Sequence, residues 1–183
     1  MSGGAALDPY DHAYLAGGEQ RVMESVIIAL VERGTLSLRA ARLRVVDAEH
    51  PPHPVERAVI AACPRGKRVE EVFADLRHCE ELDALVRRLV RLGLVRNLPR
   101  RPTRTGRRQL AAAASEGTLP AYVLEGTSAL APGPVRAGLH GAHTLPDGLG
   151  RTLRRMGKAL EDDSDTTGGG HSCGGGDGGG GGD

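Results

Sequence analysis

Arginines are concentrated in one stretch of the sequence that holds no acidic residue to balance them. Residues 84–115 contain nine arginines and neither Asp nor Glu. A guanidinium group can bind phosphate through two hydrogen bonds, and its binding releases counterions from a polyanion. Residues 87–108 are therefore a candidate segment for contact with nucleic acid, acidic lipid or an acidic protein, the alternative being a solvated helix face in an Arg-rich chain. The candidate contacts are Arg96, Arg100, Arg101, Arg104, Arg107 and Arg108, in addition to Arg87, Arg88 and Arg91 on the preceding predicted helix.

Side chains that read base sequence are scarce around these arginines. Asn97 and Gln109 are the only amides near them, whereas adenine is usually recognised by a well-placed Asn or Gln. The whole chain has no Trp, one Phe and three Tyr, which excludes most stacking platforms for single-stranded nucleic acid. The sequence thus favours contact with phosphates over recognition of bases.

Metal binding and catalysis find little support in the sequence. Zinc needs about four ligands, and the histidines lie in distant segments without a CxxC or HExxH pattern. There is also no GxSxG, P-loop or GxGxxG motif, so we expect a non-enzymatic binding or interaction module with no catalytic residue, metal or cofactor. Near the C-terminus, His171 and Cys173 could share a metal with another chain, or Cys173 could be a reactive thiol, or both could be solvated. The other candidate ligands are His50, His53, His78 with Cys79, His140 and His143.

Helix signals dominate the first half of the chain. Asp8 is suited to cap a helix that begins at Pro9, and Gly17 and Gly18 should end this helix. Apolar residues at helical spacing predict a second helix over 19–33, which Gly34 should terminate in a left-handed conformation. Alternation of apolar and polar residues then predicts a β-hairpin over 36–45 with its turn at residues 39–42.

The same signals continue through the second half. A helix is predicted to begin at Pro54 and to end before Pro64, a short helix spans 69–76, and a longer one spans 82–92 and ends at Gly93. Leu94 and Val95 could begin a strand, and after a basic loop another helix should begin near Thr103 or Thr105. The apolar spacing of Leu149, Leu153, Met156 and Leu160 predicts a terminal helix.

The segments LVERGTL (30–36) and LVRLGLV (89–95) each end a predicted helix at glycine and lead into a strand. Their offset is 59 residues, which is consistent with two copies of a helix, helix, hairpin unit. The predicted fold is mainly α with small β-hairpins, as tandem winged-helix-like units followed by a C-terminal helix and a disordered Gly-rich tail.

The composition divides the chain into three parts. A flexible N-terminus (1–6) precedes a helical domain (7–160), and a disordered tail rich in glycine follows (161–183). Within the domain we expect sub-units at 7–50 and 51–115 and a helical extension at 116–160. No run of about 20 apolar residues is present, so no transmembrane segment is predicted, and three irregularly spaced cysteines favour a reducing cytoplasm.

One motif near the start of the chain resembles a known family. It combines Asp8, Pro9 and Tyr10 with Tyr14, Gly17 and Gly18 in the segment DPYDHAYLAGG. With the predicted hairpin and HPVERAVIAA that follow, it is similar to an uncharacterised domain family of high-GC Gram-positive bacteria, many of them described as membrane proteins and some ending in Gly-rich tails. The resemblance covers residues 7–160 and implies a structural role for the motif. It also implies a peripheral position at a membrane as the alternative to the cytoplasm, and it brings no known activity or partner.

Overall fold

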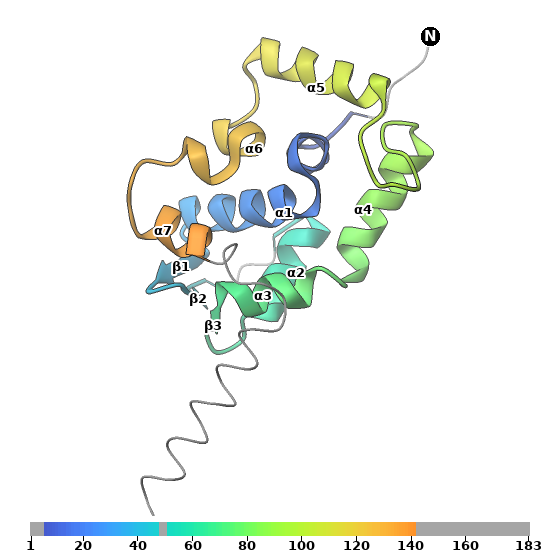
Figure 1. Cartoon of the computed structure of the whole chain (residues 1–183). Coiled ribbons are helices and arrows are strands. Elements are labelled where there is room, and N and C mark those ends of the chain that lie inside the picture. The colour runs from blue at the N-terminus through green and yellow to red at the C-terminus, as the bar shows by residue number, and fades with distance from the viewer. Residues whose placement is uncertain (1–5, 48–50, 142–183) are drawn as a thin grey trace, which may run out of the picture. The chain divides into compact units, whose positions relative to one another are not determined.

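The computed structural model describes residues 6–47 and 51–141, and the statements below concern these residues only. Helices and a small antiparallel sheet surround one long N-terminal helix (Figure 1). The elements in chain order are α1 (Pro9–Glu32), β1 (Leu36–Arg39), β2 (Arg42–Val45), α2 (Pro54–Ala62), β3 (Lys67–Arg68), α3 (Val69–Leu76), α4 (Glu80–Arg91), α5 (Arg104–Glu116), α6 (Ala121–Glu125), η1 (Gly126–Ala129) and α7 (Pro134–Gly141).

Helix α1 begins as the sequence predicts but does not end at its two glycines. The Asp8 side chain accepts hydrogen bonds from the backbone N–H groups of Tyr10 and Asp11, and Pro9 occupies the first turn. Gly17 (φ −154°, ψ 20°) and Gly18 (φ 70°, ψ −159°) leave the helical conformation, and the helix resumes directly after them. The expected stop is therefore a kink, because glycine can take up the bend within two residues.

The predicted hairpin is confirmed. Leu36 pairs with Val45 and Arg39 with Arg42, so the turn consists of Ala40 and Ala41. Both alanines have positive φ angles, 47° and 57°, as a two-residue turn joining antiparallel strands usually requires. Alanine is a poor choice for this conformation, because its Cβ crowds the backbone there.

Replacing Ala40 by Asn and Ala41 by Gly should therefore raise the free energy of unfolding by about 1–2 kcal/mol. The hydrogen bond from Val69 N–H to the Ala41 carbonyl, 3.0 Å, is preserved because it involves only the backbone. Urea denaturation measures the change. Ala40→Val, which adds a β-branched side chain at positive φ, should lower the free energy of unfolding. Equal stability of this variant and the double variant Ala40→Asn, Ala41→Gly would contradict this account of the turn.

The third strand connects the hairpin to the following helices. β3 pairs with β2 through Arg42 with Arg68 and Leu43 with Lys67, which gives the sheet order β1-β2-β3. Helix α3 begins at once after β3, and α4 follows α3 after three residues. The arrangement α3, tight turn, α4 is a helix-turn-helix in the general sense of two helices joined by a short turn.

The element order also repeats with the predicted offset. The two halves of α1 and the β1–β2 hairpin correspond, 59 residues later, to α3, α4 and the segment 94–102, in which Val95 forms an isolated antiparallel bridge with Pro102. Beyond residue 116 the structure places α6, η1 and α7, within the helical extension expected at 116–160. The predicted terminal helix and the Gly-rich tail lie outside the described residues.

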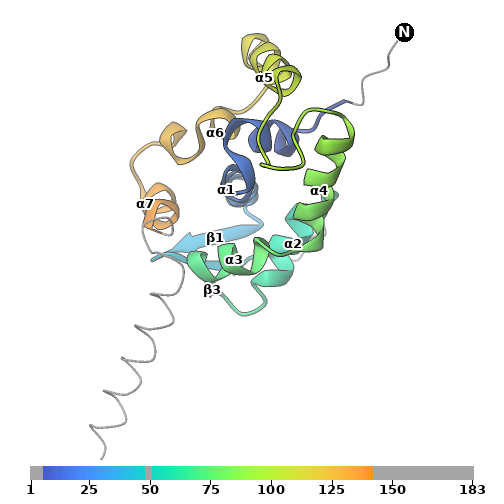
Figure 2. The same ribbon diagram turned by 45° about the vertical axis from the view of Figure 1, so that its right-hand side comes forward.

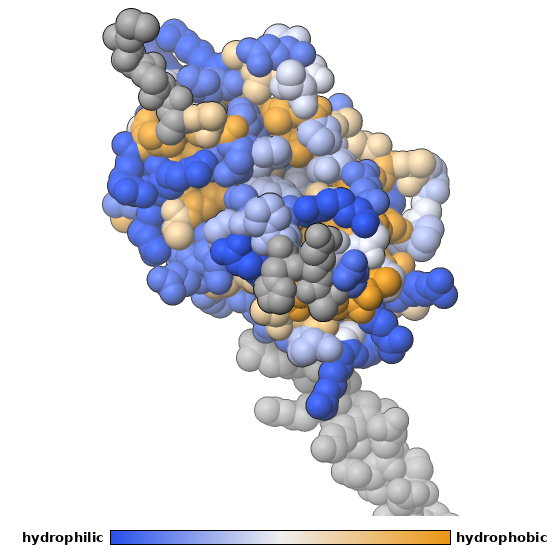
Figure 3. Space-filling model, turned by 180° about the vertical axis from the view of Figure 1, so that it is seen from behind, coloured by the Kyte–Doolittle hydropathy of each residue, from blue (hydrophilic) through white to orange (hydrophobic). Residues whose placement is uncertain are grey.

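One hydrophobic core holds both halves together. Figure 2 shows α1 between α6 and α7 on one side and α2, α3 and α4 on the other. Aliphatic side chains fill this core, as the scarcity of aromatic residues predicts, and Val22, Val26, Ile27 and Leu30 of α1 are completely buried. The regions 7–47 and 51–115 thus contribute to a single core cluster, whereas hydrophilic residues cover much of the face that Figure 3 shows.

Polar contacts attach α6 to α1. The Arg21 guanidinium donates to the Leu124 carbonyl (3.0 Å) and the Ser25 hydroxyl to the Tyr122 carbonyl (3.4 Å). Gly126 allows this approach, because a Cβ there would lie 2.2 Å from Oε2 of Glu24.

Across the described part of the chain, none of the helices combines the length and the apolar character needed to cross a bilayer.

Candidate phosphate-binding surface

The segment between α4 and α5 is a short, firmly attached hairpin. After Gly93 (φ 69°) ends α4, the Arg96 N–H donates to the Arg101 carbonyl (2.9 Å) and the Thr103 N–H to the Leu94 carbonyl (2.8 Å). We call residues 94–102 the basic hairpin. Its arms are held by backbone hydrogen bonds, so the positions of its side chains are defined.

Thr103 joins the basic hairpin to α5. Its hydroxyl donates to the Gly93 carbonyl (2.8 Å) and accepts from the Gly106 N–H (3.1 Å). The sequence predicted a helix beginning near Thr103 or Thr105, and the structure confirms Thr103 as its N-cap. The N-terminus of α5, with its partial positive charge, therefore lies beside the hairpin.

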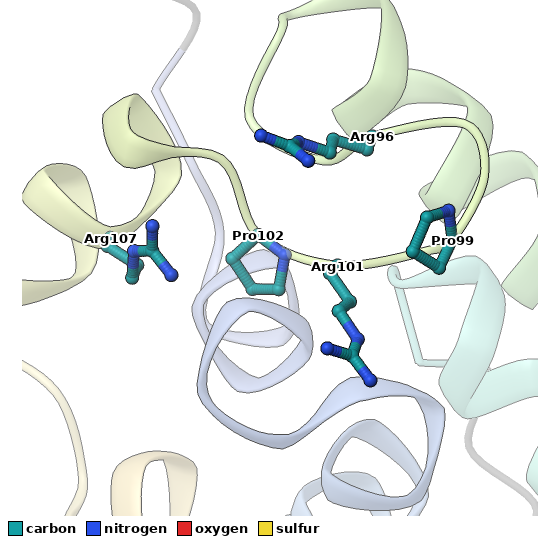
Figure 4. Close-up of a pocket in the computed structure, with 5 residues that line it drawn as sticks. All are labelled: Arg96, Pro99, Arg101, Pro102 and Arg107. Atoms are coloured by element: carbon teal, nitrogen blue, oxygen red, sulfur yellow. The ribbon is translucent and has the colours of Figure 1, made fainter.

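Three of the candidate arginines line one cavity of about 240 Å³, together with Pro99 and Pro102. In Figure 4, Arg96 and Arg107 extend toward Pro102 from two sides, and Arg101 leaves the loop in another direction. Among the described residues, the structure shows no ion pair between these three arginines and a carboxylate. The positive charge at this cavity is uncompensated.

Arg100 has a different role from its neighbours. Its guanidinium contacts Glu19 of α1 (3.0 Å) and Asp83 of α4 (3.3 Å). These contacts tie the hairpin back against two helices and neutralise the charge. Arg100 thus holds the hairpin in place, and it is not available to a phosphate in this structure.

The remaining arginines also separate into two kinds. Arg104 and Arg108 on α5, and Arg87 and Arg91 on α4, are exposed. Arg88 instead contacts Asp11, whose side chain is completely buried, and lies 3.2 Å from Asp8. The spacing of the arginines along the sequence did not distinguish the exposed ones from Arg88, which pairs with a buried carboxylate.

The motif behind the family resemblance forms a buried polar network. The Tyr10 hydroxyl donates to Glu56 of α2, and the same carboxylate accepts from Arg33 at 2.5 Å. Burial raises the pKa of Tyr10 well above its ordinary value, and the hydrogen bond to Glu56 raises it further. Tyr14 is 2 % exposed. With the Asp8 cap and the glycine kink, the motif joins α1 to α2 and α4, which is a structural role.

The histidines and cysteines that the structure describes do not gather into a site. The His53 ring caps α2 by accepting from the Val55 N–H (3.2 Å), and it stacks edge-on against Tyr10. Within the part of the chain that the structure describes, no group of three metal-ligating side chains occurs. Burial raises the pKa of the Cys63 thiol to about 11, so this thiol stays protonated. His78 and His140 are exposed, whereas His50, His143, His171 and Cys173 lie outside the described residues.

A second, larger cavity of about 530 Å³ lies between the start of α1, the end of α4 and α5. It was not anticipated, because its walls come from three segments that are far apart in the sequence. Its apolar lining includes Leu7, Leu92 and Leu119. The only sign of it in the sequence is that α5 carries small alanines where a core helix would carry larger side chains.

Comparison with known proteins adds no relatives. No family model, no curated protein and no solved structure matches this chain. The assignment of a function therefore depends on the residues described above.

Proposed function

We propose that this chain is a non-enzymatic binding module whose ligand is the phosphate backbone of nucleic acid. One observation carries the proposal: Arg96, Arg101 and Arg107 line a single cavity, and none of them pairs with a carboxylate of the residues that the structure describes. Uncompensated guanidinium groups beside a helix N-terminus favour phosphate oxygens. Because the three side chains extend in different directions (Figure 4), they suit successive phosphates of a polymer better than one small anion.

The element order supports the same proposal. Helix α2, strand β3, helices α3 and α4 and the basic hairpin follow one another in the order of a winged-helix module, in which the hairpin is the wing. The matching order in α1 and the β1–β2 hairpin would make the chain a tandem of two such units. Each hairpin carries three arginines and no acidic residue, but only the second lies within the stretch 84–115, which holds nine arginines and neither Asp nor Glu.

The charge on α4 restricts the mode of binding. In many helix-turn-helix proteins the N-terminal residues of the second helix contact base edges in the major groove. Here the first turn of α4 carries Glu80, Glu81 and Asp83, which repel phosphates. Binding through the basic hairpin and the start of α5 should therefore be insensitive to base sequence.

We expect duplex DNA to bind at low salt and to dissociate steeply as salt rises. Replacing Arg96, Arg101 and Arg107 together by Ala should flatten the slope of log affinity against log salt by about 2 to 3, since each phosphate contact contributes about 0.9. Fluorescence anisotropy with one duplex at 50–200 mM salt measures this slope. A second duplex of different sequence should bind equally well.

The matched control replaces Arg39, Arg44 and Arg65, which are exposed, by Ala. This variant loses the same formal charge but leaves the basic hairpin unchanged, so its slope should remain close to that of the parent protein. Absence of DNA binding at 50 mM salt, or an equal loss in both triple variants, would exclude the proposed surface.

A second candidate ligand is an acidic membrane surface. At the tip of the basic hairpin, Leu98 is 86 % exposed, and it could enter a lipid layer beside arginines that contact headgroups. Burial of one leucine contributes only about 1.5–3 kcal/mol, which makes this the weaker candidate. Sedimentation with vesicles containing phosphatidylserine tests it, and Leu98→Ala should weaken binding to the vesicles about tenfold if lipid is the ligand. An acidic protein would bind to the same arginines, and its affinity would not change in Leu98→Ala.

A further inference from the structure

The cavity beside α5 has the size and lining of a small-molecule site. Its volume of about 530 Å³ is within the range of about 300–1,000 Å³ that is usual for ligand pockets. One wall is formed by Leu92, which is 41 % exposed, and Leu94, which is 5 % exposed. The opposite wall is the face of α5. The remaining apolar lining consists of Ala6, Leu7, Pro9, Ala112, Ala113 and Leu119.

Helix α5 covers this cavity only loosely. The buried residues of α5 are Gly106 and Ala113. Thr105, Gln109 and Ala112 are exposed and line the cavity on the same side of the helix. The alanines at 112 and 113 leave space beside the helix, so a ligand can enter without displacing the core.

One nearly buried polar group offers an acceptor to this cavity. His12 lines the cavity and is 8 % exposed. Its Nδ1 lies 2.9 Å from the Asp8 carbonyl oxygen, and a carbonyl can only accept, so in the neutral ring Nδ1 carries the proton. Nε2 is then an acceptor, and among residues 6–47 and 51–141 the structure shows no donor bound to it.

The charges at the cavity favour a positive ligand group. Glu116 is the carboxylate among the lining residues, and no Lys or Arg is among them. Gln109, Thr105 and Thr118 add neutral polar groups at the rim. A carboxylate or phosphate would meet Glu116 without a compensating cation, whereas an ammonium group would find the Glu116 carboxylate and the His12 acceptor.

We propose that this cavity binds a small aliphatic molecule with a cationic head that donates hydrogen bonds, of the primary alkylamine class. The alkyl chain lies against Leu92, Leu94 and Leu119. The ammonium group donates to Nε2 of His12 and to the Glu116 carboxylate. The site is separate from the arginine-lined cavity and does not depend on the proposed binding of nucleic acid.

Three probes with the same chain length separate charge from hydrogen bonding. Octylamine, octyltrimethylammonium and octanoate are titrated, below micellar concentrations, into the full chain and followed by amide chemical shifts. Octylamine should bind most tightly and octyltrimethylammonium roughly 5- to 10-fold more weakly, since it cannot donate. Octanoate should bind most weakly. Equal or tighter binding of octanoate would overturn the proposal.

Two substitutions on α5 locate the site. Ala112→Phe fills the cavity and should abolish the shifts caused by octylamine. Ala114→Phe adds the same group at an exposed position of α5 that does not line the cavity, so it should leave the affinity unchanged. Glu116→Gln should reduce the affinity for octylamine several-fold. The affinity for octanoate should not fall in this variant. Octylamine binding that persists in Ala112→Phe, or that Glu116→Gln leaves unchanged, would show that the molecule binds elsewhere or without the proposed contacts.

Discussion

Replacement of Gly106 by alanine should lower the free energy of unfolding by about 1–2 kcal/mol, although alanine is the better helix former by about 1 kcal/mol. A Cβ at this position would lie 2.3 Å from the Leu94 carbonyl oxygen and 3.1 Å from the Leu15 side chain. The carbonyl is backbone and cannot rotate away, so the start of α5 must move. Urea denaturation followed by circular dichroism measures the loss.

The same displacement should be visible at the arginines. Because Thr103 links Gly106 to the Leu94 carbonyl, moving α5 disturbs the joint between the basic hairpin and Arg107. Gly141→Ala, at a helical glycine where an added Cβ would meet no described atom within 4 Å, is the control and should leave the free energy of unfolding unchanged or raise it slightly. A Gly106→Ala protein as stable as its parent would show that α5 can shift without cost.

Arg88→Ala should be more destabilising still, by about 2–3 kcal/mol. Its guanidinium contacts Asp11, whose side chain is 0 % exposed, while its own side chain is 40 % exposed. Removing one member of a buried pair typically costs about 3–5 kcal/mol because the remaining charge has no partner, and the partial exposure of Arg88 reduces that value. The N-cap of α1 is weakened as well, since Asp11 also accepts from the Asp8 N–H (3.0 Å).

Arg87 provides the control for this substitution. It is the adjacent residue on α4 and is exposed, so Arg87→Ala changes the net charge equally and should alter stability by less than about 0.5 kcal/mol. The difference between the two variants in chemical denaturation isolates the contact with Asp11. Similar stabilities of the two variants would mean that Asp11 is satisfied in another way.

Local features of the fold were predictable from the sequence because they depend on neighbouring residues. Asp8 followed by Pro9 specifies a helix start, Gly34 and Gly93 specify helix ends, and alternation over 36–45 specifies a hairpin. The helix end predicted at Gly17 and Gly18 was wrong because this prediction also used neighbouring residues alone. A glycine pair marks a break in the helix, but whether the chain turns away or resumes the helix depends on the packing of the following segment.

Long-range features were not predictable in the same way. Nothing near Arg88 or Arg100 in the sequence indicates that one binds Asp11 and the other Glu19, each about 80 residues away. The arginines around the cavity therefore could not be separated from those engaged in ion pairs. The helical extension expected at 116–160 did not specify the short helices α6 and α7, because their positions depend on contacts with α1 and β1 and their own apolar pattern is weak.

The central position of α1 has a consequence for how the chain is made. Synthesis proceeds from the N-terminus, so α1, the longest of the described helices and a large part of the core, emerges from the ribosome before the helices that cover it. Its partner α6 follows about 100 residues later, as the contact between Arg21 and Leu124 shows. At a synthesis rate of about 5–20 residues per second, α1 has no α6 to cover it for about 5–20 seconds, an interval in which a chaperone that binds apolar segments should recognise the nascent chain.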